Sequence, residues 1–194
     1  MTPDQRRQMI VQAALPLVAA SGSAVTTLQV ARAAGIGEAT IFRVFPTKDA
    51  LLDAVVAAVL RPDRALTEID AIPLHQPLAD RLIAAAAALQ AHLDRMGTAL
   101  GALHASGHNR DRRRPPAAAG PRAAAPTATR DAVARLFEPE RHALRHPPAR
   151  LAEVLIGLLL ARGRPLGGGE AARLTVPQLV DLLLHGALAE GGDR

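Results

Sequence analysis

Histidines at helical spacing are the first residues in this chain whose pattern could do chemistry. Two pairs lie four residues apart, a spacing that sets two imidazoles on one helix face, where they could bind a divalent metal. No Asp or Glu stands where it would complete such a site. Gly107 lies inside the first pair and Pro147 directly follows the second, so each helix is interrupted there. We therefore expect no metal site, and metal binding by histidine stays an alternative. The pairs are His104 with His108 and His142 with His146.

The residue types of the chain also bear on whether it could be an enzyme. The chain has no cysteine, which excludes thiol nucleophiles, disulfides and zinc ribbons. No nucleophile–base pair and no carboxylate dyad stands out. There is no Trp or Tyr and there are three Phe, too few for an aromatic-lined pocket or a base-stacking platform. We expect no enzymatic activity, no catalytic residue and no cofactor.

The positive charge of the chain is concentrated in one stretch. The 194 residues carry a formal net charge of +5. Residues 107–131 hold six arginines and two aspartates, so 6 − 2 = +4 of that excess lies there. The arginine cluster at 112–114 is read as part of a solvated loop. Bulk charge is therefore weak evidence for a nucleic-acid partner, and any such argument needs specific residues.

Apolar residues recur at three- and four-residue spacing through most of the chain, which predicts an all-α fold. No alternating strand pattern and no repeat is present. Residues 61–77, which hold three prolines, are predicted to form a loose connection, and residues about 107–126 a flexible loop. Helices are expected over residues 5–20, 27–34, 38–45, 50–60, 78–103, 127–138 with a continuation toward 145, 148–162 and 176–190.

A helix-turn-helix is the clearest local pattern. Thr26 and Gln29 have the spacing of a capping box at the start of one short helix. Gly35 has the place of a left-handed residue that ends that helix, and a second short helix follows from Glu38. Such a pair, here at about residues 26–45, can put the start of its second helix against base edges in a major groove.

The longer string TTLQVARAAGIGEATIFRVFPTKDALL, which begins at Thr26, resembles the N-terminal domain of the tetracycline-repressor (TetR) family. The resemblance covers roughly residues 6–60, and the cap, turn, aromatic and lysine positions agree in spacing. Three positions depart from the family pattern. Gly37 stands where the family often has Ser, Phe42 where it often has Tyr, and Val44 where a polar or aromatic residue is usual. Phe42 has no hydroxyl for a phosphate, which is expected to weaken that contact.

The resemblance implies a set of DNA contacts. Thr27, Thr40 and Lys48 would contact phosphates, with Thr40 also able to reach a base edge. Ala39 would touch a thymine methyl and Arg43 would pair with guanine. Glu38 would either accept from a cytosine amino group or simply favour the start of its helix. The implied DNA-binding residues are Thr27, Glu38, Ala39, Thr40, Phe42, Arg43 and Lys48.

The rest of the chain is expected to bind an effector and to dimerise. Two segments, 154–160 and 179–184, are apolar nearly all round, so each needs cover from its own domain and from a partner subunit. The residues expected at the dimer interface are Leu155, Leu158, Leu159, Leu179, Leu182, Leu183 and Gly186. The candidate lining of a pocket for a small apolar effector is Leu82, Leu89, Leu93 and Phe137.

The sequence therefore predicts a DNA-binding domain over residues 1–60 and a helical effector-binding and dimerisation domain over 61–194. The function expected is a cytoplasmic, dimeric, ligand-responsive transcriptional repressor on a palindromic operator. No apolar run approaches the roughly 20 residues of a membrane span, so no membrane partner is expected. Two alternatives stay open: a regulator without an effector, and a helical ligand- or metal-binding protein or small enzyme whose DNA head is vestigial. Effector, operator, regulated genes and the sign of regulation stay open.

Overall fold

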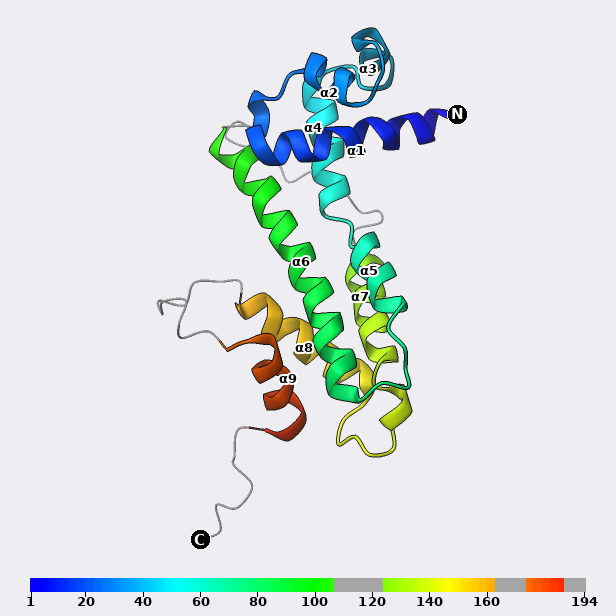
Figure 1. Cartoon of the computed structure of the whole chain (residues 1–194), viewed down its shortest axis with the longest axis vertical. Helices are drawn as coiled ribbons and strands as arrows, with labels where there is room; N and C mark the ends of the chain where they lie inside the picture. The colour runs from blue at the N-terminus through cyan, green and yellow to red at the C-terminus, as the bar shows by residue number, and fades with distance from the viewer. Residues whose placement is uncertain (107–123, 163–173, 187–194) are drawn as a thin grey trace. The chain divides into compact units, whose positions relative to one another are not determined.

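The computed structural model describes residues 1–106, 124–162 and 174–186, and the regular structure in these ranges is helical throughout (Figure 1). The predicted all-α class is confirmed. The chain forms two compact units, which are described separately. The first comprises Met1–Arg61 and the end of the long helix α6 (Leu78–Ala105) from Asp94 onward, and the second comprises Pro62–Leu93 and the described residues after 123.

Threonine side chains fix where the helices of the first unit begin. Thr2 and Thr26 each form a capping box with a glutamine three residues later, and Thr47 accepts from the Ala50 N–H at 3.1 Å. The cap expected at Thr26 is thus confirmed. The helices are α1 (Pro3–Ser21), a 3-10 turn (Gly22–Ala24), α2 (Thr27–Ala33), α3 (Glu38–Val44) and α4 (Lys48–Val59).

The core of the first unit is built on the apolar face of α1. Ile10, Ala14 and Val18, spaced by four, are fully buried. They pack in one cluster with side chains from α2, α3 and α4 and with the end of α6. In the α2–α3 segment, Val30, Ile41 and Phe45 are buried and Ile36 is partly buried against the same cluster.

The second unit packs its helices around one apolar cluster. Its helices are α5 (Asp63–Asp70), the first half of α6, α7 (Ala124–Arg135), a 3-10 turn (Glu138–Glu140), α8 (Pro148–Arg162) and α9 (Val176–His185). Thr175 and Gln178 form a capping box at the start of α9, as the sequence indicates. The fully or nearly fully buried members of the cluster include Ile69, Leu82, Val133, Leu136, Phe137, Leu155, Leu159 and Val180.

Helix α5 corrects the expected loose connection over residues 61–77. Its only buried apolar side chains are Ala65 and Ile69, one turn apart, which is too short a pattern to indicate a helix in the sequence. Contacts with α7 supply the missing stability, because Arg135 donates to the Ile69 carbonyl at 3.2 Å and to the Asp70 carboxylate at 3.1 Å. A cation at this helix end also suits the helix dipole.

Other boundaries shift by a turn or less. Residues 124–126, expected in the loop, form the start of α7, and residues 107–123 lie outside the described part of the chain, together with the 112–114 arginine cluster. The continuation of helix toward 145 is wrong, because a short 3-10 turn and irregular backbone follow α7. Helix α9 ends at His185, and residues 187–190 of the expected helix lie outside the described part.

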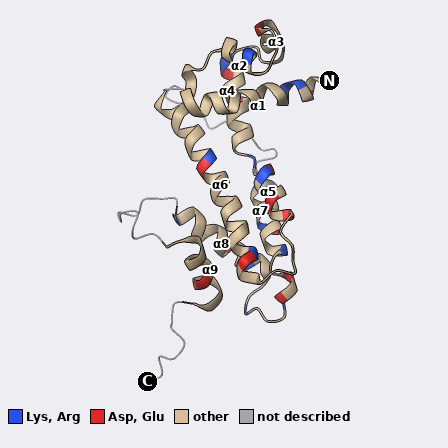
Figure 2. Ribbon diagram, viewed as in Figure 1, with Lys and Arg blue, Asp and Glu red and all other residues tan. Residues whose placement is uncertain are grey.

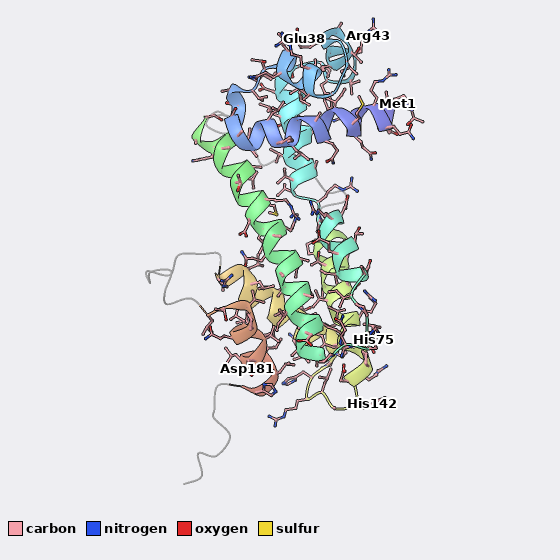
Figure 3. The ribbon with its side chains drawn as sticks, viewed as in Figure 1. Met1, Glu38, Arg43, His75, His142 and Asp181 are labelled. Atoms are coloured by element: carbon pink, nitrogen blue, oxygen red, sulfur yellow. The ribbon has the colours of Figure 1, made fainter. Side chains whose placement is uncertain are left out.

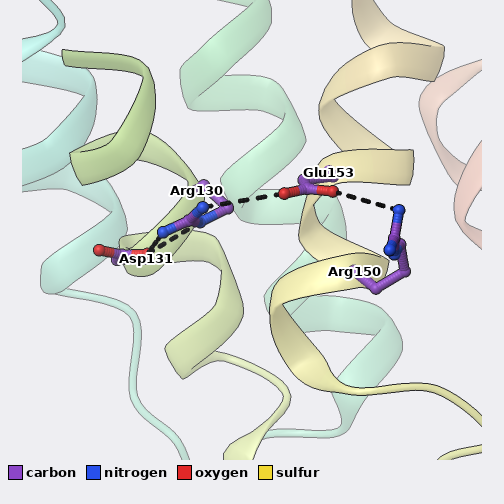
Figure 4. Close-up of polar contacts among 4 residues, drawn as sticks. All are labelled: Arg130, Asp131, Arg150 and Glu153. Carbon is purple, nitrogen blue, oxygen red and sulfur yellow. Dashed lines mark hydrogen bonds and ion pairs between the residues drawn. The ribbon is translucent and has the colours of Figure 1, made fainter. Parts of the chain in front are cut away.

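Exposed ion pairs connect α7 to α8 (Figure 4). Arg130 donates to the Asp131 carboxylate at 2.8 Å and lies 3.8 Å from Glu153, whose other oxygen lies 3.9 Å from Arg150. The hydrogen bond to Asp131 raises the pKa of Arg130 above its ordinary value. These pairs are exposed to solvent, so water and salt screen them. No helix in the described residues is both long and apolar enough to cross a bilayer.

Candidate DNA-binding site

The turn between α2 and α3 has the geometry of a glycine-terminated helix. Gly35 has φ +66°, in the left-handed region expected for it. The Ile36 N–H bonds to the Ala31 carbonyl at 3.0 Å, and the Gly35 N–H bonds to the Arg32 carbonyl at 3.2 Å. This Schellman pattern reverses the chain and starts α3 three residues later. The sequence expectation of a helix-turn-helix at about residues 26–45 is met by α2 and α3.

Helix α3 presents one exposed face, which consists of Ala39, Phe42 and Arg43. Ile41 on the opposite side is buried in the core, and Phe42 is 48% exposed, which is unusual for a phenylalanine in a small domain. Arg43 makes no hydrogen bond or ion pair within the described ranges, so its guanidinium is available to a partner. Figure 3 labels Glu38 and Arg43 on this helix. Thr40 is half-buried beside the exposed face.

Two of the expected DNA contacts are bonded to each other. The Thr27 hydroxyl donates to a Glu38 carboxylate oxygen at 2.5 Å, which connects the first turn of α2 to the first turn of α3. Gly37, the N-cap of α3, has no side chain to cap the helix, and the Glu38 carboxylate lies in the first turn, where the helix dipole favours it. This arrangement matches the structural role of Glu38. A phosphate contact by the Thr27 hydroxyl requires this bond to be exchanged.

Lys48, the only lysine of the chain, is also engaged within the first unit. Its ammonium donates to the Ser23 carbonyl at 2.6 Å, which joins the start of α4 to the connection between α1 and α2. An ammonium has three donors, so two remain for a phosphate while this bond is kept. No local sequence pattern indicates the Ser23 contact, because the two residues are 25 positions apart.

Arginine also covers the core of this unit. The Arg7 guanidinium lies 4.4 Å from the centre of the Phe45 ring, a cation–π distance. The first unit carries charges of both signs, with acidic as well as basic residues near α2 and α3 (Figure 2). The first unit therefore has no uniformly basic surface, and any recognition of DNA would depend on specific side chains.

Residues 10–55 match the model of a family described as bacterial regulatory proteins, tetR family. These helices of the first unit therefore resemble a TetR-family domain. Solved structures of proteins described as regulators of that family are similar in fold over most of the chain. A TetR-family transcriptional regulator from Streptomyces coelicolor has a TM-score of 0.54 at 21% identity, covering 94% of this chain and 78% of its own. A second regulator from the same organism has a TM-score of 0.52 at 24% identity, covering 93% and 97%.

A third solved structure is that of a protein from Mesorhizobium loti described as a TetR-family transcriptional regulator. It has a TM-score of 0.57 at 17% identity and covers 94% of this chain and 95% of its own. At these identities the likeness concerns the fold alone. Together, the TetR-family domain and this fold support a DNA-binding transcriptional regulator. The matched family is described as one of regulatory proteins.

The other candidate residues lie in the second unit. Leu82, Leu89 and Phe137, expected to line an effector pocket, are buried in its core, and Leu93 is half-buried. Of the residues expected at the dimer interface, Leu155, Leu159 and Leu179 are buried in the same core. Leu158, Leu182 and Leu183 are half-buried, and Gly186 is exposed.

The histidine pairs form no metal centre in the described residues, where no cluster of three or more potential ligands occurs. His142 and His146 lie in irregular backbone, so their spacing of four does not place them on one helix face. His104 is exposed near the end of α6, and its partner His108 lies outside the described part.

If Lys48 contacts a phosphate, as the resemblance implies, Lys48→Ala should weaken binding to specific and scrambled duplexes alike. The slope of log K against log salt concentration should then fall by about 1, because that contact would be lost. Fluorescence anisotropy over a salt titration measures this slope. Thermal unfolding of the same variant reports the loss of the Ser23 bond separately. A lower melting temperature with an unchanged salt slope would show that Lys48 serves the fold alone.

If α3 docks on DNA, Glu38→Gln should increase affinity for all duplexes several-fold at low salt. One negative charge near the phosphates would be removed while Thr27 keeps a hydrogen-bond partner. Asp4→Asn, which removes a charge from the first turn of α1, is the matched control for net charge. Anisotropy with duplexes that differ at single positions measures both effects. A changed base preference at one position would instead make Glu38 a base-reading residue.

Proposed function

We propose that this chain is a dimeric transcriptional repressor that binds a two-fold symmetric operator and releases it when a small molecule binds the second unit. The observation that carries the proposal is the exposed face of α3, with an unengaged Arg43, in a helix-turn-helix of a TetR-family domain. A recognition helix of this kind puts a few side chains at base edges, and Arg paired with guanine is the commonest specific contact.

Dimerisation is supported by the apolar side of α8. Val154 and Leu160 are 42% and 51% exposed, and the exposed Gly157 lies between them on the helix surface. Leu182 and Leu183 of α9 are only half-buried by the described residues. A second copy of the chain would cover these side chains, while Leu155, Leu159 and Leu179 hold α8 and α9 to their own subunit. Two reading heads then require a repeated half-site.

Ligand response is supported by the course of α6. This helix supplies Leu82, Leu89 and other core residues to the second unit, and its end supplies Leu103 to the core of the first. A ligand that binds one arrangement of the second unit more tightly would favour that arrangement and change the operator affinity. Its differential affinity sets the largest response.

The proposal is tested by anisotropy of the purified full-length protein on the DNA upstream of its own coding region, with a scrambled duplex as control. Specific binding is expected, and Arg43→Ala should cost roughly 1–3 kcal/mol on the specific duplex. Arg64→Ala, which removes an exposed arginine paired with Glu68 in α5, is the matched control and should have no effect. Equal, weak binding to both duplexes, unchanged in Arg43→Ala, would contradict the proposal.

Oligomeric state is tested by sedimentation equilibrium. Val154→Glu and Leu160→Glu should each convert a dimer into monomers, because an unpaired carboxylate would be buried at the interface. Arg150→Glu near the start of the same helix, at an exposed position, is the control and should leave the dimer intact. A monomeric wild-type protein that still binds a single half-site would contradict the dimeric part of the proposal.

A further inference from the structure

Arg81 is a fully buried charged side chain in the core of the second unit. It lies in α6 beside Leu82, and none of its surface is exposed. One terminal nitrogen, Nη2, donates to Oε1 of Glu140. The other two nitrogens, Nε and Nη1, are buried and have no hydrogen-bond partner in the described residues, and neither has Oε2 of Glu140.

This ion pair leaves most of its hydrogen-bonding groups unused. A guanidinium stays charged at any accessible pH and matches a carboxylate best through two parallel hydrogen bonds. Here one carboxylate oxygen accepts a single hydrogen bond from one guanidinium nitrogen. Three buried polar atoms, Nε and Nη1 of Arg81 and Oε2 of Glu140, have no hydrogen-bond partner in the described residues. Buried polar groups in folded proteins are nearly always bonded, and a buried charge is costly unless all its donors are satisfied. A purely structural pair would be expected to use both oxygens.

Residues of the apolar core lie close to Arg81 and Glu140 along the chain. Ala85, one turn further along α6, is fully buried, and Phe137, just before the turn that holds Glu140, is fully buried as well. A molecule that satisfied Nε and Nη1 would need an oxyanion at one end and an apolar remainder. Neutral apolar molecules, the class that the sequence alone indicates, would leave these nitrogens unbonded.

We propose that Arg81 anchors the carboxylate of a small amphipathic acid, and that Glu140 holds the same guanidinium until the acid displaces it. This inference rests on the proposed function, since the acid would be the effector of the repressor. The Glu140 side chain is 38% exposed and belongs to a three-residue 3-10 turn, so its carboxylate can rotate into water while α6 stays in place. Ligand and Glu140 compete for one cation, and removing the charge of Glu140 therefore favours the ligand.

Isothermal titration calorimetry of the full-length protein tests this with a panel of carboxylates and their uncharged methyl esters. The panel holds straight-chain acids of four to ten carbons, benzoate and phenylacetate, each kept in the monomeric range. At least one acid should bind wild type ten-fold or more tightly than its ester. Glu140→Gln should tighten binding of that acid several-fold, and Arg81→Met should abolish the preference for acid over ester. Arg130→Met removes an exposed arginine of the same unit and should behave as wild type.

If no acid is preferred over its ester by either wild type or Glu140→Gln, the inference is overturned. Glu140→Gln keeps the buried cation, so the test stands even where Arg81→Met fails to fold. Measuring operator binding with the same protein preparations distinguishes failure of the carboxylate anchor from failure of the proposed function. Specific DNA binding without any carboxylate preference would overturn the anchor and leave the regulator in place. Carboxylate preference without DNA binding would support the anchor and contradict the repressor.

Discussion

Phe45→Ala should destabilise the first unit by about 3–5 kcal/mol, the usual cost of removing a buried phenylalanine. The ring is fully buried among side chains of α1, α2 and α4, and the Arg7 guanidinium covers it at 4.4 Å. That cost is a large part of the 5–15 kcal/mol by which small domains are stable. We therefore expect the melting temperature to fall sharply and DNA binding to be lost at 37 °C. Thermal unfolding by circular dichroism measures the first effect.

Phe42→Ala is the matched control, three residues earlier in the same short segment. Phe42 is 48% exposed on the outer face of α3, so its removal should change stability by no more than about 0.5 kcal/mol. Its loss should instead reduce affinity for the operator several-fold, since an apolar contact with DNA disappears. Equal loss of stability in both variants would show that α3 is packed with its outer face against the protein, contrary to the structure.

Gly22→Ala should be nearly as damaging, because two independent costs add. Gly22 ends α1 with φ +55° and ψ −135°, a conformation that costs an L residue roughly 1–3 kcal/mol. A Cβ atom there would lie 2.3 Å from the Ala102 carbonyl oxygen on α6. Overpacking of that kind adds about 1–3 kcal/mol. Urea unfolding of the variant should show a loss within the sum of these ranges.

Gly35→Ala separates the two costs. Gly35 also has positive φ, at +66°, but nothing lies within 4 Å of a Cβ built on it. Only the backbone cost of the left-handed conformation applies, about 1–2 kcal/mol. A Gly22→Ala variant no less stable than Gly35→Ala would mean that α1 and the end of α6 are not in contact. The hydrogen bond from the Ser23 N–H to the Ser106 hydroxyl, 2.7 Å long, would then be absent as well.

Local sequence signals predicted much of the first unit, because each of its helices has its own cap or stop. The threonine cap at 26 and the glycine at 35 lie where the sequence places them. Helix α5 was missed because tertiary contacts with α7, rather than its two buried residues, hold it. Propensity and periodicity carry no information about such contacts.

The candidate site was predictable in its residues but not in its bonding. The exposed face of α3 follows from helical periodicity once Ile41 and Phe45 are placed in the core. The Thr27–Glu38 and Lys48–Ser23 bonds join residues 11 and 25 positions apart, and only the fold brings them together. The Arg81–Glu140 pair could not be predicted from the sequence either, because its residues are 59 positions apart and only the fold brings them together.

Selection of bound sequences from a random duplex pool is the most direct measurement of the central claim, that α2 and α3 form a sequence-reading head. Wild type should enrich one motif that occurs twice in opposite orientation. Arg43→Ala should enrich the same motif with its preference relaxed at one position in each half-site, where guanine is read. No enriched motif with wild type, or an identical motif with Arg43→Ala, would contradict this account.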